Sequence, residues 1–498
     1  MSEIPFVGGS YDSDIPEISI QRTINMFPEI VSNNEATSKY VLRQRPGVGL
    51  WESIPSDDVK NINGGCRGMT TASANGKVYG VWGGFVYEID YDKSIKKIAT
   101  IANSTAPVSI VDCDKYLGIA DGHEMYLIDY SDYTIKSPTL PFSKPTHIAY
   151  MFKRIYAICD DDTIDGTASN SSKVYWSYLI GDSEFWTWNA LNHLTAETKA
   201  DANKNICVMN GKLWVFGTLS YQIMSPTATG VSNLSGGGGD IGLGSEWSLV
   251  TIGQHLYLVG SGAEGANTFY TNNGYNLQRI SNPAIERDLA KASEVDDVFS
   301  TGYMADGHSF VLFGMVKGDK TLVYDITTRQ FFEWSTRDRY QDNHHKFNIS
   351  NIIRSPWGTL LCGDFTSPNI LVLDPDKCDD WSVNDSHLPR LCERISPTYR
   401  NLSKIVYYAS FELDMEHGDH KVLSGQGSEP KVMLSCSDDG REWFDTQTAS
   451  IGAQGQYKTR TIWRRLGSSK SRTFKVSISD PVYVCILHAS ADMHVGGK

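Results

Sequence analysis

The sequence lacks most features that identify common enzymes, secreted proteins and membrane proteins. It has no C-x-x-C, G-x-S-x-G or H-E-x-x-H motif, so it carries no short signature of a zinc site, a serine hydrolase or a metalloprotease. No stretch approaches the roughly 20 apolar residues of a membrane-spanning helix. The opening MSEIPFVGGSYDSD lacks the charged start and apolar centre of a secretory signal. We therefore expect neither a membrane span nor a secretory leader, although missing motifs alone do not exclude an enzyme.

Positive charge is also scarce. The 498 residues contain 45 Lys and Arg against 58 Asp and Glu, which gives a formal net charge of −13. Such an acidic chain repels DNA at long range, whereas a general DNA-binding protein normally has the opposite sign. One stretch differs, KTRTIWRRLGSSKSRTFKVSI at 458–478, which has seven cations and no Asp or Glu from Lys458 to Lys475.

Cysteines are few and widely spaced. Their number is odd, and no two of them stand at the spacing of a redox or zinc motif. This pattern favours a reducing, cytosolic place of assembly over a disulfide framework. The nine are Cys66, Cys113, Cys159, Cys207, Cys362, Cys378, Cys392, Cys436 and Cys485.

Runs of strong helix formers are scarce, while Gly (44), Tyr (25) and Trp (12) are plentiful, which favours strands and turns. A short unit recurs along the middle of the chain. Each copy has a turn, a cation or polar residue, and an apolar and aromatic strand that ends near Gly. The seven copies are NGKVYGVWGG (75–84), CDKYLGIADG (113–122), FKRIYAICDD (152–161), NGKLWVFGTL (210–219), GQHLYLVGSG (253–262), DGHSFVLFGM (306–315) and WGTLLCGDFT (357–366).

The spacing of these copies indicates the architecture. From Lys77 to Thr359 the seven copies leave six intervals with a mean of 47 residues. A period of about 40 to 50 residues is that of a four-stranded propeller blade. We therefore predict an all-β fold with a β-propeller-like domain of six or seven blades, rather than unrelated hairpins in sandwiches.

The pattern changes at both ends of the repeat region. Residues 1–64 read as an extended N-terminal arm with short strands, and residues 391–498 contain strand candidates separated by the turns GQGSEP and SDDG. We predict three parts: an arm over 1–64, the propeller over 65–390 and a C-terminal β-sandwich-like domain over 391–498.

One motif supports a different function. SCSDDGREWF (435–444) places Asp438, Gly440 and Trp443 like the Asp-box turn of sialidase propellers, although Cys436 stands where that motif has Ser or Thr. The Asp box is a structural hairpin, and glycoside cleavage would need separately placed carboxylates. A glycan-binding or glycan-cleaving propeller remains the alternative function.

Other candidate sites have simpler interpretations. CDDDTIDGT (159–167) resembles a calcium loop through Asp161, Asp165 and Gly166, but Ser172 stands where an EF-hand has Glu, so we interpret it as a solvated turn. The pair of histidines in NHHKF has no further ligand at metal-site spacing.

The run SGGGGDIGLGSE (235–246) lacks the Gly-Lys-Ser/Thr ending of a phosphate-binding loop, and its consecutive glycines predict a mobile surface loop. The sequence thus predicts no catalytic residue, no metal site and no cofactor.

The basic stretch reads as two strands. In the second, Phe474, Val476 and Ile478 alternate with polar residues, as in a half-buried strand. The first has Arg and apolar residues on the same face, and Gly467 to Lys470 would close a hairpin. The predicted faces are Arg460, Ile462, Arg464 and Leu466 on one side and Trp463 and Arg465 on the other.

A face that mixes Arg with Trp suits a protein interface. Binding to DNA phosphates is the rival interpretation, and a solvated hairpin paired with acids elsewhere is the simplest one.

Several segments resemble the tail hub, or packaged-DNA stabilisation protein, of short-tailed phages typified by the Salmonella podoviruses. They cover both ends and part of the middle of the chain, in the same order. The segments are INMFPE (24–29), YVLRQRPGVG (40–49), GKLWVFGTLSYQIMSPTATG (211–230) and LSCSDDGREW, RTIWRRLG and RTFKVSISDPVYV within 434–484.

The resemblance implies a non-enzymatic protein of the virion tail, assembled in the host cytoplasm. Such proteins form a homohexameric ring beneath the portal-adaptor, continue its DNA channel, carry tailspikes or tail fibres, and receive a needle or plug that retains the genome. Double-stranded DNA would pass without sequence-specific binding. Our predicted protein interface comprises Arg43, Arg45, Arg460, Trp463, Arg464, Arg465, Lys470 and Arg472.

Overall fold

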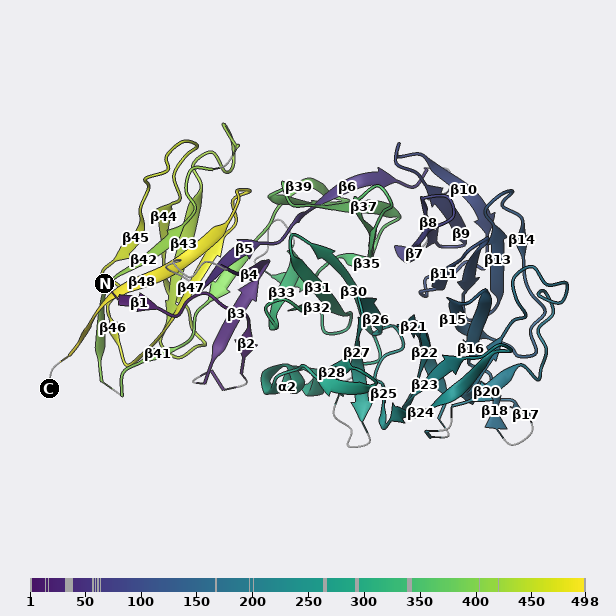
Figure 1. Ribbon diagram of the computed structural model, residues 1–498. Coiled ribbons are helices and arrows are strands. Elements are labelled where there is room, and N and C mark those ends of the chain that lie inside the picture. The colour runs from purple at the N-terminus through teal and green to yellow at the C-terminus, as the bar shows by residue number, and fades with distance from the viewer. Residues whose placement is uncertain are drawn as a thin grey trace.

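In the computed structural model, a ring of small sheets and a sandwich of two sheets lie next to each other (Figure 1). The structure describes the chain except residues 1, 14, 17, 32–38, 56, 57, 59, 61, 63, 166, 167, 197, 200, 263–266, 292–294, 338–342, 403, 420, 497 and 498. The described part is almost entirely β-structure, which confirms the predicted fold class. None of its helices is long and apolar enough to cross a membrane.

The described residues form seven blades. The first strand of each blade lies towards the ring centre, and β35 of blade 7 lies against β7 of blade 1, so the ring is closed. The ring thus confirms the predicted propeller.

The strands of each blade follow one another from the ring centre outward. Blades 1 and 2 are β7 (Cys66–Ala72), β8 (Lys77–Trp82), β9 (Phe85–Ile89) and β10 (Ile95–Thr100), then β11 (Ser109–Cys113), β12 (Tyr116–Ala120), β13 (Met125–Asp129) and β14 (Ile135–Lys136). Blades 3 and 4 are β15 (Pro145–Met151), β16 (Arg154–Cys159), β19 (Lys173–Trp176) and β20 (His193–Thr195), then β21 (Asn203–Met209), β22 (Lys212–Gly217), β23 (Tyr221–Pro226) and β24 (Val231–Gly239).

Blades 5 and 6 are β25 (Ile241–Leu243) with β26 (Val250–Ile252), β27 (His255–Gly262), β28 (Asn267–Asn273) and β29 (Asn276–Arg279), then β30 (Val298–Ala305), β31 (His308–Met315), β32 (Lys320–Asp325) and β33 (Gln330–Arg337). Blade 7 is β35 (Ile349–Arg354), β36 (Leu360–Asp364), β37 (Asn369–Asp374) and β6 (Gly47–Ser53), extended by β38 (Asp379–Ser382) and β39 (Asp385–Pro389).

Four smaller elements lie between these strands. They are the hairpin β17 (Ile164–Asp165) and β18 (Ala168–Ser169), the 3-10 turn η1 (Asn170–Ser172), the helix α2 (Pro283–Lys291) and β34 (His344–Lys346). Helix α2 begins after Asn282, whose side-chain oxygen accepts hydrogen bonds from the amides of Ala284 and Ile285, as expected of a helix N-cap.

Each of the seven sequence repeats forms the second strand of its blade, namely β8, β12, β16, β22, β27, β31 and β36. These strands are covered on both faces by neighbouring blades, which is why they read as continuous apolar runs rather than as alternating ones. In blade 1, for example, Val78 packs towards blade 7, and Tyr79 and Val81 pack towards blade 2. The repeat period therefore identified the real structural unit.

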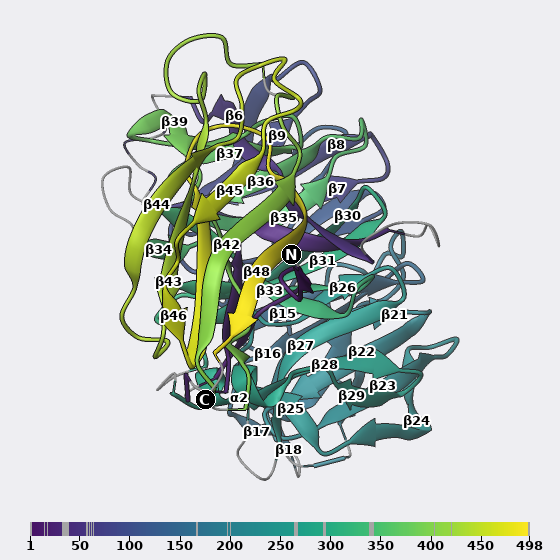
Figure 2. The same cartoon turned by 90° about the vertical axis from the view of Figure 1, so that its left-hand side faces the viewer.

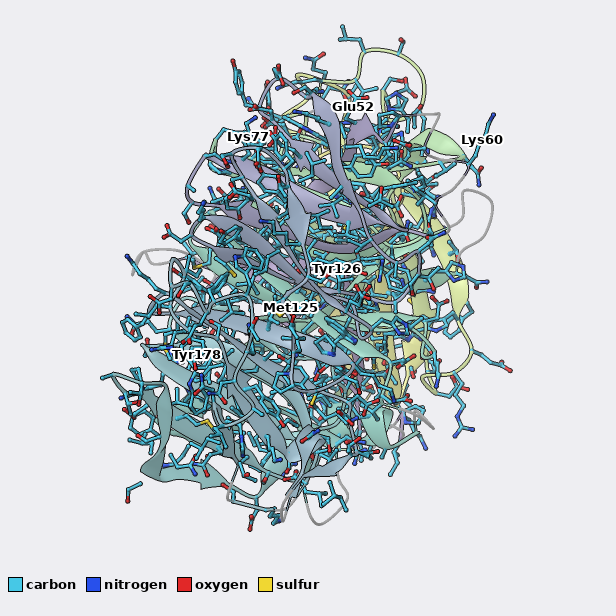
Figure 3. All side chains as sticks on the ribbon, turned by 90° about the vertical axis from the view of Figure 1, so that its right-hand side faces the viewer. Glu52, Lys60, Lys77, Met125, Tyr126 and Tyr178 are labelled. Carbon is cyan, nitrogen blue, oxygen red and sulfur yellow. The ribbon has the colours of Figure 1, made fainter. Side chains whose placement is uncertain are left out.

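The two faces of the ring carry different loops, because successive antiparallel strands turn at opposite ends. Figure 3 shows Lys77, at the first turn of blade 1, and Tyr178, in the loop after β19, on the same side of the ring, with Lys60 on the other side. The β17–β18 hairpin interrupts the connection from β16 to β19. It therefore belongs to the face opposite Lys77 and Tyr178.

The N-terminal segment completes blade 7. Strand β6 pairs antiparallel with β37, with Gly49 opposite Val372, and so places a strand from near the start of the chain beside one from the end of the repeat region. This pairing closes the ring by hydrogen bonds between distant parts of the chain. Breaking the ring therefore requires the loss of a complete strand pairing.

The C-terminal part is a sandwich of two sheets, as predicted. Phe411 and Trp463 from one sheet and Phe474 from the other meet in its core. One sheet contains β4 (Met26–Ile30), β5 (Tyr40–Gln44), β48 (Cys485–Val495), β42 (Val406–Met415) and β45 (Thr461–Arg464), with β1 (Ser2–Ile4) paired to β48 and β46 (Ser468–Ser469) paired to β42. The other contains β40 (Cys392–Ile395), β47 (Ser471–Ile478), β43 (Lys431–Ser437) and β44 (Phe444–Ser450), with β41 (Tyr399–Arg400).

A single strand joins the two parts. Strand β3 (Ile20–Ile24), flanked by β2 (Tyr11–Asp12), pairs with β33 of blade 6 on one side and with β40 of the sandwich on the other. One continuous sheet therefore runs from the propeller into the sandwich, and Figure 2 looks along it from the sandwich side. The N-terminal segment thus contributes strands to both parts.

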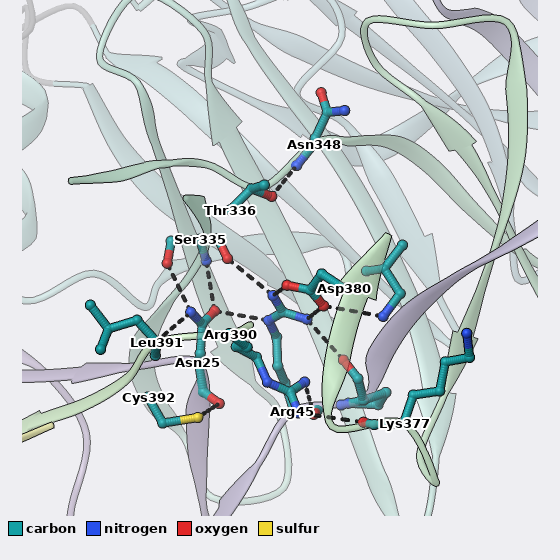
Figure 4. A network of polar contacts seen from close by, with 12 residues as sticks. Asn25, Arg45, Ser335, Thr336, Asn348, Lys377, Asp380, Arg390, Leu391 and Cys392 are labelled. Carbon is teal, nitrogen blue, oxygen red and sulfur yellow. Dashed lines mark hydrogen bonds and ion pairs between the residues drawn. The ribbon is translucent and has the colours of Figure 1, made fainter. Parts of the chain in front are cut away.

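A buried polar network lies where the N-terminal segment meets blade 6 and blade 7 of the propeller (Figure 4). Asn25 has a left-handed φ of 58°, and its side chain bonds both to blade 6 through Ser335 and to Leu391. Arg45 lies beside it with a fully buried side chain. Its guanidinium donates two hydrogen bonds to Asp380, at 2.9 and 2.6 Å, and one to the side-chain oxygen of Asn25 at 2.8 Å. The network ties β3, blade 6 and blade 7 together.

A second charged cluster supports the same junction. Arg22 of β3 donates two hydrogen bonds to Glu333 of β33, at 3.0 and 2.7 Å, and Lys320 lies 3.7 Å from the same carboxylate. Burial raises the pKa of Glu333, but the charges of Lys320 and Arg22 outweigh it and lower this pKa to about 2. The carboxylate is therefore held ionised between the two parts.

The expectation of a mobile glycine-rich loop is wrong, because residues 236–239 belong to β24. Gly238 and Gly239 pair with Gln222 and Tyr221 of β23. A Cβ atom at Gly239 would lie 2.7 Å from the ring of Tyr221, and one at Gly238 would lie 2.5 Å from the hydroxyl of Thr198. The glycines allow this close approach, and the strand pairing offsets the entropy cost of ordering them.

Arg45→Met should lower the free energy of unfolding by about 3 to 5 kcal/mol, because it leaves the carboxylate of Asp380 buried and unpaired. Urea unfolding followed by tryptophan fluorescence measures the change. Arg43→Met is the matched control, since the Arg43–Glu29 pair is partly exposed and should contribute less than about 1 kcal/mol. Equal effects of the two substitutions would contradict the structural role of Arg45.

The junction should also weaken in acid. A carboxylate with a lowered pKa stabilises the fold above its unfolded pKa, 4.5 for Glu333, and loses this effect as the pH falls towards 2. We expect Glu333→Gln to cost about 3 kcal/mol at pH 7 and to remove part of the stability loss between pH 4.5 and 2. Urea unfolding at several pH values tests this, and an unchanged pH profile would contradict it. Glu29→Gln is the control.

Candidate interaction surface

The basic stretch does not form the predicted hairpin. Strand β45 pairs with β42 in one sheet of the sandwich, whereas β47 pairs with β40 and β43 in the other. The residues between them cross from one sheet to the other. The prediction was wrong because alternation shows that two strands exist but does not show which partners they take.

The crossing also changes the predicted faces of the first strand. Arg465 has a left-handed φ of 61°, which breaks the alternation after Arg464. Leu466 therefore turns into the core with Trp463, rather than sharing a face with Arg464. The indole nitrogen of Trp463 donates a hydrogen bond to the carbonyl of Gln447 at 3.2 Å. Arg464 and Arg465 are both exposed.

Three of the cations have partners within the chain. Arg472 has a side chain 2% exposed and donates to Asp438 at 2.6 Å and to the carbonyl of Leu466. Arg460 forms a two-point ion pair with Glu412. Lys475 lies over the ring of Trp443 and near Glu393. These side chains stabilise the sandwich.

The other four cations are exposed and, within the described part of the chain, their side chains make no hydrogen bond or ion pair. They are Lys458, Arg464, Arg465 and Lys470, which lie in or next to β45 and β46 on the open edge of their sheet. Arg464 stands opposite Ser410 and Ser469 opposite Val406, so the cations spread over roughly 13 Å or more of strand. Charges on an exposed edge also discourage unwanted strand pairing.

The two arginines predicted from the N-terminal segment lie elsewhere. Arg45 belongs to the buried junction. Arg43 lies in β5, which two other strands separate from β45 in the same sheet, and it donates hydrogen bonds to Glu29 and to the hydroxyl of Tyr483. It lines a cleft of about 710 Å³ between blade 7 and the sandwich loops, together with Lys377 and His387. The predicted interface residues thus do not form one continuous surface.

The other sequence motifs have structural roles in this fold. The Asp-box-like segment forms the turn between β43 and β44 in the sandwich, not in a propeller blade, and its Asp438 binds Arg472.

The calcium-loop candidate is a hydrogen-bonded turn. Its Asp161 accepts hydrogen bonds from the amides of Ser143 and Thr163. Gly166 and the side chain of Asp165, named with it as calcium-loop candidates, lie outside what the structure describes.

The neighbouring histidines do not converge. His344 contacts the hydroxyl of Ser335 at 2.8 Å, whereas His345 contacts Asp319 at 2.6 Å. Successive strand residues point to opposite faces. Within the described residues, no three His, Cys, Asp or Glu side chains lie close enough to hold a metal ion. All nine cysteines are free thiols, as expected.

A loop of blade 5 lies against the inner strands of the propeller. Residues 244–249 interrupt the first strand of blade 5 and contact the first strands of three other blades. The carbonyl of Glu246 accepts a hydrogen bond from Asn205 of β21, and the carbonyl of Trp247 accepts one from Ser300 of β30. The indole of Trp247 packs on His147 of β15, with ring centres 4.4 Å apart.

The structure has an exposed apolar surface that the sequence analysis did not predict. Four large apolar side chains are exposed at the end of the sandwich where β42 begins and β48 ends: Leu402 (90%), Ile405 (44%), Tyr407 (52%) and Val495 (46%). The alternation of β42 contains the signal, because Tyr408 and Phe411 point into the core and Tyr407 therefore points out.

Comparison with protein families gives two matches. The family described as "Bacteriophage P22 Gp10, beta-propeller" matches residues 2–378, and the one described as "Bacteriophage P22 Gp10, beta-sandwich" matches residues 392–494. No curated protein matches the chain.

Solved structures that resemble the chain are distant from it in sequence. The extracellular domain of the putative hybrid two component system BT4673 from B. thetaiotaomicron is 10% identical with a TM-score of 0.43, and the match covers 66% of this chain and 39% of that chain. The Neurospora crassa Pan2 WD40 domain is 10% identical with a TM-score of 0.39, covering 66% of this chain and 94% of that one. This chain thus spans well under half of the BT4673 domain.

The two family matches follow the two parts of the fold. The propeller match includes the N-terminal strands that close blade 7, and the sandwich match begins at β40. Together they cover nearly the whole chain. The chain therefore belongs to the bacteriophage P22 Gp10 family of phage tail structural proteins.

Proposed function

We propose that this protein is a tail hub, or nozzle, that forms a homohexameric ring below the portal-adaptor of the virion. The ring continues the DNA channel, retains the packaged genome, guides its ejection, and offers attachment sites for tailspikes or tail fibres and for a needle or plug. The protein acts in the virion tail after assembly in the host cytoplasm, and it catalyses no reaction. The observation that carries this proposal is the family match over both the propeller and the sandwich.

The mechanical design of the protomer supports a structural role. The continuous sheet through β3 and the two buried charge networks resist bending between propeller and sandwich. A channel wall must keep its shape under the pressure of packaged DNA, and a chain with two rigidly joined parts meets that need. The three predicted parts, 1–64, 65–390 and 391–498, remain our working division.

The propeller centre suggests where DNA runs. Glu246 and Trp247 lie against the inner strands of blades 3, 4 and 6 and so narrow the space along the propeller axis. We propose that DNA passes through the axis of the subunit ring instead. The net charge of −13 suits a wall that lets phosphates slide past without binding them.

We also propose that the exposed part of the predicted interface docks an acidic surface of a neighbouring tail protein or subunit. Arg464 and Arg465 are adjacent, exposed and on an open sheet edge. Arginines with free donors at a strand edge give electrostatic complementarity to a partner. Arg45, Trp463 and Arg472 would support this surface from within, because their side chains are buried.

Arg464→Glu with Arg465→Glu should abolish incorporation into tails while the protomer stays folded. The exposed arginines contribute little to folding, so circular dichroism and the urea midpoint should match the unchanged protein. Incorporation is measured by mass spectrometry of purified virions and by binding to the purified portal-adaptor. Binding should fall by about tenfold or more, as for loss of charge pairs at an interface.

The control carries the same charge change on the propeller, Lys153→Glu with Arg329→Glu, at two other exposed cations. It should incorporate normally. Normal incorporation of the Arg464 and Arg465 variant, with loss only of a salt-sensitive affinity for DNA, would contradict the docking role and support the rival DNA contact.

A further inference from the structure

The exposed apolar side chains at the end of the sandwich form a patch with a basic rim. We call Leu402, Ile405 and Tyr407 the end patch, whereas Val495 pairs with the core residue Val406 and so lies on the other face of the sheet from Tyr407. Gly496 links its members, since its amide donates to the carbonyl of Ile405 and a Cβ there would lie 3.1 Å from the ring of Tyr407. Leu402 has a left-handed φ of 43° and the largest exposed fraction in the patch. A soluble protein rarely displays large apolar residues together without a partner.

Three exposed cations surround the end patch. Lys404 lies within its turn, and Lys470 follows Ser469, which pairs with Val406. Arg400 pairs with Ser471, the next residue. One acid lies nearby, Asp492, whose carboxylate is 3.6 Å from His494. The patch therefore fits an apolar side chain flanked by carboxylates.

The chain itself carries such a feature on the propeller. Ile164 in β17 has an exposed fraction of 73%, and the exposed Asp160 and Asp162 precede it. The side chain of Asp162 accepts a hydrogen bond from Ser171, and within the described residues neither acid has a basic partner. We call Asp160, Asp162 and Ile164 the acidic knob.

Two other exposed apolar side chains next to acids differ on this point. Tyr91 is flanked by Asp90, which pairs with Lys77, and by Asp92, whose carboxylate accepts a hydrogen bond from the amide of Ser94. Val383 lies near Asp379, which pairs with His387. At each of these two sites at least one carboxylate is thus paired inside the chain. Among the described residues, the acidic knob is the one of the three in which neither named acid has a basic partner.

The end patch and the acidic knob cannot meet within one molecule. Figure 1 places β41 and β46 at one end of the long axis and β17 and β18 at the other, and both lie towards the same side of the molecule. A contact between these surfaces must therefore join two copies. Such a contact uses two different surfaces, and contacts of this kind close into rings when the rotation between copies allows it.

We propose that the end patch of one copy binds the acidic knob of the next, with Ile164 among the three apolar side chains and Asp160 and Asp162 facing Arg400, Lys404 and Lys470. The proposal rests on the ring of the proposed function and names its contact surfaces. Buried apolar area would supply affinity, and the opposite charges would select the register.

Charge exchange tests the contact through sedimentation velocity of the purified full chain over a range of concentrations. Lys404→Glu with Lys470→Glu, and separately Asp160→Lys with Asp162→Lys, should each weaken self-association by about tenfold or more. The chain with all four substitutions should associate again, because its charges are complementary in the opposite sense. Leu402→Ser with Tyr407→Ser should also weaken association.

The matched controls change the same charges or sizes elsewhere. Asp92→Lys with Asp132→Lys alters two exposed acids of blades 1 and 2, and Tyr91→Ser with Leu191→Ser removes two exposed apolar side chains. Both should self-associate like the unchanged protein. An unchanged protein that stays monomeric at every concentration, or a four-substitution chain that fails to regain association, would overturn the contact.

The sedimentation results and the composition of purified tails together distinguish a failure of this contact from a failure of the proposed tail function. If the patch and knob variants self-associate normally while the protein is present in purified tails, the contact is wrong and the tail function stands. If the protein is absent from tails, the tail function fails whatever the sedimentation shows.

Discussion

The whole structure depends on how Asn25 and Arg45 are held between the propeller and the sandwich. At Asn25 the chain leaves β3, which belongs to the sheet shared with blade 6, and enters β4, which belongs to the other sheet of the sandwich. The left-handed backbone at this residue makes the change of direction possible, and Asn tolerates that conformation better than most residues. Its side-chain amide then bonds to Ser335, Leu391 and Arg45, so every polar atom of that side chain has a partner at the change of sheet.

Buried arginines recur where the chain is irregular. Arg394 binds the carbonyls of Phe6 and Gly9, and Arg472 binds that of Leu466. A guanidinium has five donors in a planar arrangement, so one side chain can satisfy several carbonyls of an irregular segment. The cost of burying the charge is lowered by these bonds. The arginines thus join the N-terminal segment and the sheet crossing to the regular strands.

The cations of residues 458–475 form two groups, one bonded within the sandwich and one exposed on its edge. Arg464 and Arg472 carry the same charge within one basic stretch, yet one is exposed and the other is bonded to Asp438. The difference comes from the crossing at Arg465, which turns the chain between the sheets. The exposed edge of β45 and the apolar end of β42 then lie on the same sandwich, and both remain available to partners.

The sequence alone determined the β-propeller and its repeat, because each second strand is covered on both faces and must be apolar throughout. It also determined the alternation of β47 and, by resemblance, the family. Only the tertiary structure decided that β6 closes blade 7, that β3 joins the two parts, and that the basic stretch crosses between sheets. The first two are pairings between residues hundreds of positions apart, and side-chain periodicity records which face of a strand is buried but not which strand lies beside it.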